Sequence, residues 1–194
     1  MGAIGGCLMF LVVLVVLAAI WAIWRYNNLI TLKNQVTNAW KQIDVQLKRR
    51  HDLIPNLIAA VKGEMQFEQD TLEKVIQARN SAVAARGVAD AADKENQLTQ
   101  TLSKLFALTE NYPTLKSNEA VKSLMEELSS TENKIGFARQ FYNDIATRFN
   151  IAQQVFPDKF IATTFNFQPV ELFEIKDAAE REVPKVDLNL RPQA

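Results

Sequence analysis

The chain begins with a long apolar segment, and this segment constrains its fold more than any other feature. Residues 3–24 read AIGGCLMFLVVLVVLAAIWAIW, and all of the 22 Lys+Arg and 22 Asp+Glu lie at Arg25 or beyond. A helix of this length spans roughly 33 Å, close to the ~30 Å hydrocarbon core of a bilayer. Trp and Tyr side chains at its C-terminal end are typical of the membrane surface. The sequence therefore predicts an uncleaved membrane anchor over residues 1–25.

A cleaved signal peptide is the main alternative to an anchor. It fits poorly, because no basic region precedes the apolar run and the run itself is too long. Cys7 precedes the most hydrophobic part of this run, which starts at Leu8, and does not end it, so a lipoprotein signal is disfavoured, while palmitoylation of Cys7 stays open. A single cysteine also excludes an intramolecular disulfide.

Charge is divided unevenly along the chain. Residues 25–52 hold six Lys+Arg and two Asp+Glu, a net charge of +4, which leaves 16 basic and 20 acidic residues, or -4, for the remainder. Basic residues next to an anchor favour the cytoplasmic side, although long domains can override this rule, so the periplasmic side stays open. The two opposite charges predict attraction within or between subunits, and we expect high salt to loosen an assembly held in that way.

Beyond the anchor, the sequence predicts an all-α fold. Apolar positions from residue 121 to 152 alternate at spacings of three and four, with Thr131 the one polar exception. Asn118 or the serine before it can cap this helix. A second seam from residue 29 to 61 is interrupted only by Arg50. The remaining predicted helices cover residues 67–85 and 91–110.

Pro55 makes the second seam ambiguous. With Asp52 as an N-cap, a new helix could begin there and place Pro55 in its first turn. Alternatively, a single helix continues through Pro55 with a kink. The sequence does not choose between these two.

Short loops between long helices imply antiparallel neighbours. We therefore predict an elongated antiparallel bundle of about four long helices over residues 26–156. Residues 157–194 are predicted to form an extended tail interrupted by prolines. The aromatic residues of this tail, and Phe156 just before it, are expected to dock on the bundle or, in part, on a neighbouring subunit: Phe156, Phe160, Phe165, Phe167 and Phe173.

The sequence predicts no catalytic, cofactor-binding or metal site. The zero net charge removes the general argument for nucleic-acid binding, and one His with one Cys is too few for a typical zinc site. No glycine-rich phosphate loop follows the anchor. His51, within the run KRRHD, is predicted to lie at the surface or in a turn. The basic residues of that run are expected to pair with the acidic remainder of the domain or of a neighbour.

The last long helix interleaves polar and aromatic side chains. We expect them to form a polar layer between helices that fixes register, with a ligand pocket as the alternative. The residues concerned are Asn133, Phe137, Arg139, Phe141, Tyr142, Asn143 and Asp144.

Three stretches of the chain resemble the LemA family. They are YNNLITLKNQVTNAWKQIDVQLKRRHDLIPNLIAAVKGEMQFE, TENKIGFARQFYNDIATRFN, and FPDKFIA followed by ELFE. The resemblance implies a bacterial single-pass membrane protein with a helical-bundle domain and no established enzymatic activity. It carries over no active-site residue.

These observations predict a non-enzymatic scaffold that is anchored in the bacterial inner membrane, self-associates, and organises or shapes the membrane. Its expected partners are membrane lipids, through the N-terminal helix, and further copies of itself, with no nucleic acid and no cofactor. An adaptor or regulator of another envelope protein, such as a membrane protease or sensor, is the alternative. An enzyme of unrecognised type is a more distant one.

Overall fold

The computed structural model describes residues 2–63, 65 and 68–174, except for the side chains of residues 2–5 and 7. This part of the chain contains helices and no strand, which confirms the all-α prediction. In chain order the helices are α1 (Gly2–Val61), α2 (Gln69–Ala84), α3 (Val88–Thr109), α4 (Pro113–Ser117), α5 (Glu119–Ala152) and α6 (Asp158–Thr164).

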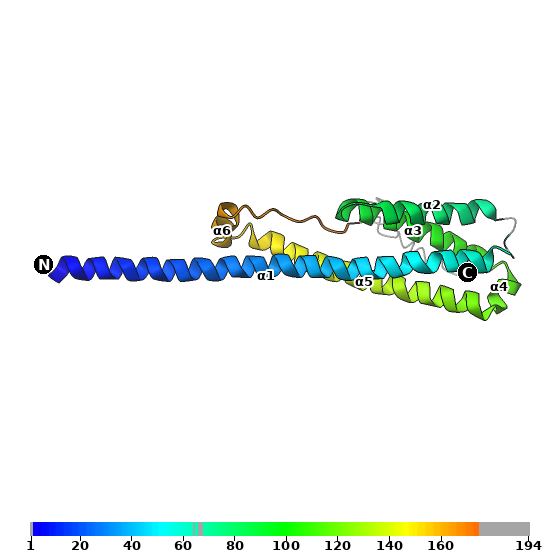
Figure 1. Ribbon diagram of the computed structural model, residues 1–194, viewed down its shortest axis with the longest axis horizontal. Helices are drawn as coiled ribbons and strands as arrows, with labels where there is room; N and C mark the ends of the chain where they lie inside the picture. The colour runs from blue at the N-terminus through cyan, green and yellow to red at the C-terminus, as the bar shows by residue number, and fades with distance from the viewer. Residues whose placement is uncertain (1, 64, 66–67, 175–194) are drawn as a thin grey trace, which may run out of the picture.

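The apolar segment and the first bundle helix form one continuous helix, α1 (Figure 1). Pro55 lies inside it, so no new helix begins at Asp52. A proline has no N–H to donate to the carbonyl four residues earlier, here that of His51. Nε of Arg79, on α2, donates to this carbonyl at 3.2 Å instead. A side chain from a neighbouring helix thus replaces the hydrogen bond that Pro55 cannot make.

The helices follow the predicted antiparallel order. α1 and α5 run side by side in opposite directions, and α2 and α3 form a hairpin that covers only the half of this pair distant from the N-terminus (Figure 1). Four helices therefore surround the core only in this distal half. In the half nearer the N-terminus, α1 and α5 pair without α2 and α3.

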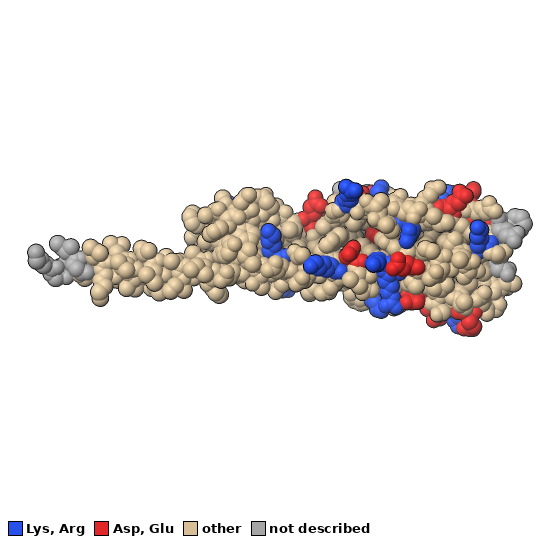
Figure 2. Space-filling model, viewed as in Figure 1, with Lys and Arg blue, Asp and Glu red and all other residues tan. Residues whose placement is uncertain are grey.

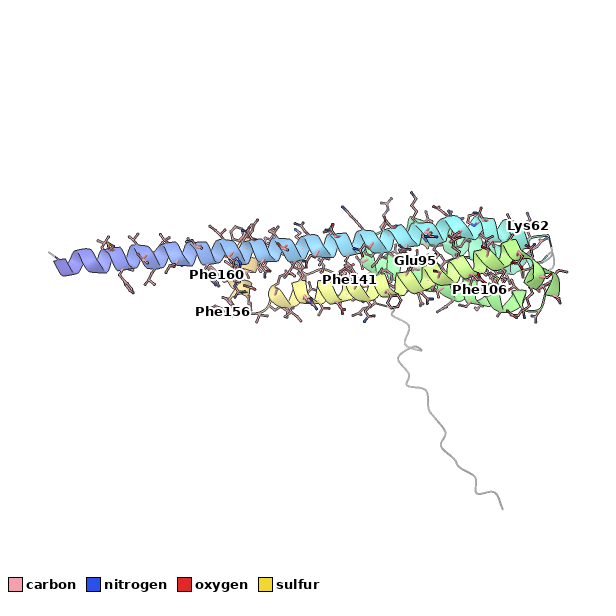
Figure 3. All side chains as sticks on the ribbon, turned by 90° about the horizontal axis from the view of Figure 1, so that it is seen from below. Lys62, Glu95, Phe106, Phe141, Phe156 and Phe160 are labelled. Carbon is pink, nitrogen blue, oxygen red and sulfur yellow. The ribbon has the colours of Figure 1, made fainter. Side chains whose placement is uncertain are left out.

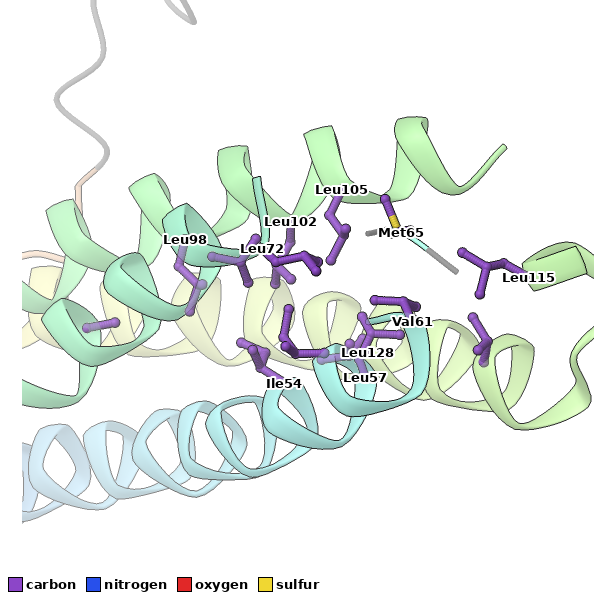
Figure 4. Close-up of a cluster of buried hydrophobic side chains, with 14 residues drawn as sticks. Ile54, Leu57, Val61, Met65, Leu72, Leu98, Leu102, Leu105, Leu115 and Leu128 are labelled. Carbon is purple, nitrogen blue, oxygen red and sulfur yellow. The ribbon is translucent and has the colours of Figure 1, made fainter. Parts of the chain in front are cut away.

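Both predicted seams face the interior. Every seam position from residue 29 to 61 on α1 and from 121 to 152 on α5 is buried or half-buried. The distal core joins them to leucines of α2 and α3, as Figure 4 shows. Burying a leucine side chain contributes about 1.5–3 kcal/mol, so this packing is a main source of stability. The seams are consequently used within one chain.

Local residue chemistry sets the starts of two helices, and the sequence indicates the first of them. Asn118 caps α5, since its Oδ1 accepts hydrogen bonds from the backbone N–H groups of Ala120 and Val121. Gly87, at the turn between α2 and α3, has a φ of 82°, which glycine adopts without steric cost.

The C-terminal segment begins with a short helix, α6, that the sequence pattern did not indicate. After α6 the chain runs extended along the bundle over residues 168–174, covering part of the half that α2 and α3 leave open (Figure 1). Phe173 is buried and Phe167 packs against the same core, as expected for docking. Phe156 and Phe160 are instead strongly exposed. The rest of the predicted tail, residues 175–194, lies outside the described residues.

Candidate functional site

The seam exception Arg50 sits at the centre of a buried ionic network. Its side chain is 1% exposed, and its Nη1 lies 3.2 Å from Oε2 of Glu95 and 3.1 Å from Oε2 of Glu132. Its Nη2 donates to Oγ1 of Thr99 at 2.8 Å. Two carboxylates and a hydroxyl thus compensate a cation that would be very costly to bury alone.

His51 belongs to the same network. Its Nε2 lies 2.7 Å from Oε1 of Glu95, and the residue is buried. The prediction of a surface or turn histidine was therefore wrong: His51 is the helical neighbour of Arg50 and faces the same acidic residue on α3. Arg49, on the outer side of α1, pairs with Glu127 at 2.5 Å. Both arginines of the run KRRHD thus pair with acidic residues of their own chain, as one of the two expected pairings had it.

Burial and charge act in opposite directions on the arginines of this region. Desolvation lowers the pKa of Arg50, while the nearby Glu132 and Glu95 act to raise it. Desolvation also lowers the pKa of Arg139. The guanidinium of Arg139 lies 4.5 Å from the ring centre of Phe173, and its Nε and Nη2 have no hydrogen-bond partner among the described residues.

A cavity of about 470 Å³ adjoins the network between α3, α4 and α5. Leu102, Phe106 and Leu115 supply part of its apolar wall, and Arg50 and Glu132 line it together with further charged and hydroxyl residues of α3, α4 and α5. Since those two groups already pair with each other, they do not converge on the empty space. The nearby His51 is held by Glu95 in the same way. The network therefore has the features of a structural lock between α1, α3 and α5.

Of the α5 residues expected to form a polar layer between helices, Asn143 and Tyr142 instead bind the tail, as does Asn150, while Asn133 and Asp144 are exposed. Asn150 donates from Nδ2 to the carbonyl of Val170 and accepts from its N–H. Asn143 makes the same pair of bonds with Phe173. Tyr142 donates its hydroxyl to the carbonyl of Glu171 at 2.7 Å. The spacing of seven residues between the two asparagines puts them on one face of α5, and this was the available signal for a bound strand-like segment.

A shallow groove of about 580 Å³ opens on the opposite side, between α1 and α5. Phe137 is 74% exposed there, and Phe141 and Val45 are exposed beside it. Figure 3 shows Phe141 standing off α5 at the middle of the bundle. Lys41 and Lys134 flank the groove. Two exposed phenylalanines and a valine in one groove form an apolar patch of the kind that mediates association.

The apolar part of α1 projects beyond the bundle. It is long and apolar enough to cross a membrane, and none of its most apolar stretch is buried. In Figure 2 this stretch carries no charged side chain on the visible face, whereas Lys, Arg, Asp and Glu gather on the bundle. An exposed apolar helix of this length needs an apolar environment.

This projecting apolar helix and the attached bundle define a class, the membrane-associated helical-bundle proteins. Within that class the chain belongs to the LemA family, which it matches over residues 39–188. It is 26% identical over 184 residues to protein LemA of Metamycoplasma hominis, covering 94% of this chain and 81% of that protein.

Two further relatives are magnetosome proteins. The chain is 25% identical over 182 residues to magnetosome protein MamQ 2 of Paramagnetospirillum magneticum, covering 80% of this chain and 67% of the relative. It is 24% identical over 196 residues to magnetosome protein MamQ of Magnetospirillum gryphiswaldense, covering 87% and 72%.

Proposed function

We propose that this protein is a non-enzymatic scaffold that spans the bacterial inner membrane once through α1 and self-associates through the groove of Val45, Phe137 and Phe141. The observation that carries the proposal is this exposed aromatic groove on an otherwise well-packed bundle. Side-by-side copies would organise or shape the membrane around their anchors. The Lys and Arg residues after the anchor favour a bundle on the cytoplasmic side.

The groove is the surface best suited to association for two reasons. The apolar seams of α1 and α5 are buried within one chain. The arginines of the run KRRHD pair with acidic residues of the same chain. Among the apolar residues that stay exposed, Phe137, Phe141 and Val45 lie together in a short strip between α1 and α5. Burying each phenylalanine against a second copy contributes about 1.5–3 kcal/mol.

The anchor constrains how two copies meet. Both apolar segments enter the same membrane, so both bundles point the same way, and a two-fold axis along the membrane normal then brings identical patches together. In this arrangement Phe137 lies against Phe137 of the second copy. The stems of Lys41 and Lys134 extend the apolar contact while their ammonium groups reach water.

Sizing of the detergent-extracted full chain over micromolar concentrations tests the proposal. We expect a dimer or larger assembly for the wild type. Phe137→Asp should weaken association by about a hundredfold or more, because each symmetric dimer loses two buried phenylalanines. Val83→Asp is the matched control, because Val83 is an exposed apolar residue of α2 outside the groove.

A monomeric wild type across that range would contradict self-association. An adaptor role would give a different result: crosslinking from position 137 in cells would capture one heterologous envelope protein and not a second copy. An enzyme would require the loss of a cellular phenotype on substituting a single polar residue, such as His51 or Asp144, with the bundle and its assembly intact.

A further inference from the structure

α6 and the turn before it present an apolar surface that the bundle does not use. Phe156 is 85% exposed and Phe160 is 70% exposed, and Val155 is exposed beside them. Figure 3 shows Phe156 and Phe160 at the end of the bundle from which the N-terminal part of α1 projects. We call the surface formed by Val155, Phe156 and Phe160 the α6 apolar face.

Contacts with α1 fix the level of this face along the anchor. Ile161 and Ala162, on the inner side of α6, are buried against Leu29 and pack near Ala22 and Tyr26 of α1. The outer side of α6, with Phe160, is therefore held at the height where the uncharged segment ends.

An ion pair marks the same height. Nε of Arg25, the first charged residue of the chain, lies 3.4 Å from Oδ1 of Asp158, the first residue of α6. The Arg25 guanidinium also lies 5.0 Å from the ring centre of Trp24 and 5.8 Å from that of Trp21. Tryptophan rings beside an arginine are the usual composition of a membrane–water boundary.

The polar groups of α6 are compatible with that boundary. The hydroxyls of Thr163 and Thr164 donate to backbone carbonyls within α6, so they do not need water as an acceptor. Lys159 is exposed next to Phe160 and can reach lipid phosphates. Asp158 is paired with Arg25 by charge, although its Oδ1 accepts no hydrogen bond within the described part of the chain.

From this geometry we propose that the α6 apolar face inserts into the headgroup–acyl boundary of the bilayer, as a second membrane contact beside the α1 span. The inference rests on the proposed membrane span. Exposed Phe side chains gain by leaving water, and a short amphipathic element at the boundary is a common way to achieve this. Two contacts, from α1 and α6, would then fix the tilt of the bundle relative to the membrane, which a single helix leaves free.

The test uses the full chain in phosphatidylcholine–phosphatidylglycerol vesicles, with Cys7→Ser as the background because Cys7 is the single cysteine. An environment-sensitive fluorophore is attached in turn at Phe160→Cys, Val83→Cys and Leu14→Cys. Val83 is an exposed apolar residue of the bundle, and Leu14 lies within the apolar span. Spin labels near the headgroup or near the end of the acyl chain serve as lipid quenchers, and iodide serves as the aqueous quencher.

We expect the probe at position 160 to be quenched more by the shallow spin label than by the deep one, with a several-fold lower iodide quenching constant than at position 83. The same lipid quenching at 160 as at 83 would overturn the proposal. Protection from iodide without lipid quenching would also overturn it, by showing that a protein surface covers Phe160. The probe at position 14 separates the two claims, since loss of deep quenching there would refute the membrane span itself.

Discussion

Arg50 shows how a single residue can be located by pattern and still be understood only from the fold. The seam on α1 identifies it as the one charged member of a buried row, and it is indeed buried. Its partners Glu95, Thr99 and Glu132 come from α3 and α5, far along the chain, and no local pattern connects them. His51 was misplaced for the same reason, since the acid that holds it is on another helix.

Neighbouring arginines allow a matched test of this network. Arg50→Met should lower the free energy of unfolding by about 3–5 kcal/mol, because it leaves buried carboxylates without their cation. Arg49→Met removes the exposed pair with Glu127 and should cost less than about 1 kcal/mol. Chemical denaturation in detergent, followed by circular dichroism, measures both. Equal, small losses would show that the network is not a lock.

Tyr142 gives a pH-dependent test of the tail contact. Burial raises the pKa of its hydroxyl above the usual value of 10, and Glu171 adds to the effect. As pH rises past 10, the unfolded chain loses this proton first, so the unfolded state binds fewer protons and the free energy of unfolding falls. At neutral pH the free energy of unfolding of the wild type should exceed that of Tyr142→Phe by about 1 kcal/mol, because the variant lacks the hydrogen bond to Glu171.

This difference should shrink as pH rises above 10. Denaturation curves of the two proteins over a pH series measure it. A difference in the free energy of unfolding that stays constant through the alkaline range would contradict a raised pKa of the Tyr142 hydroxyl.

At the scale of elements, periodicity predicted the helices well and their junctions poorly. The bounds of α5 and its cap at Asn118 follow from local chemistry that the sequence displays. Continuity of α1 through Pro55 does not, because the carbonyl freed by the proline is satisfied by Arg79 from α2. α6 is too short for a periodic signal, and its place against α1 depends on tertiary contacts at Leu29.

The two asparagines of α5 should control the order of the tail. Asn150→Leu removes both hydrogen bonds to Val170, so the Val170 amide loses its acceptor and should exchange its hydrogen faster. Asn143→Leu should have the same effect at Phe173. Asn133→Leu, at an exposed site of the same helix, is the control. Native-state hydrogen exchange reports each amide, and unchanged protection at Val170 would show that apolar docking alone orders the tail.

At the scale of the molecule, ion pairs within the chain join its basic and acidic regions. Three arginines of the +4 region pair with acidic residues of the -4 remainder. The pairs are Arg25 with Asp158, Arg49 with Glu127, and Arg50 with Glu95. These three arginines are therefore already used within one chain, which weakens the expectation of salt-sensitive attraction between subunits. The apolar groove, flanked by two lysines, takes over as the expected contact.

Salt now has the opposite expected effect on assembly. Raising NaCl from about 0.1 M to about 1 M shortens the Debye length from about 10 Å to about 3 Å and screens repulsion between Lys41 and Lys134 of facing copies. Association should persist or tighten in sedimentation experiments at both concentrations. Dissociation at high salt would contradict the apolar interface and indicate ionic contacts between subunits.

Crosslinking between two copies in isolated membranes tests the central claim most directly. In a Cys7→Ser background, Phe137→Cys is oxidised or treated with a short bis-maleimide, beside Val83→Cys as the control. We predict that Phe137→Cys forms a covalent dimer and that Val83→Cys forms none. The yield of the Phe137→Cys dimer should stay the same when the sample is diluted with membranes lacking the protein before crosslinking. Failure of Phe137→Cys to link two copies, with the protein folded and membrane-bound, would contradict a scaffold that assembles through the α1–α5 groove.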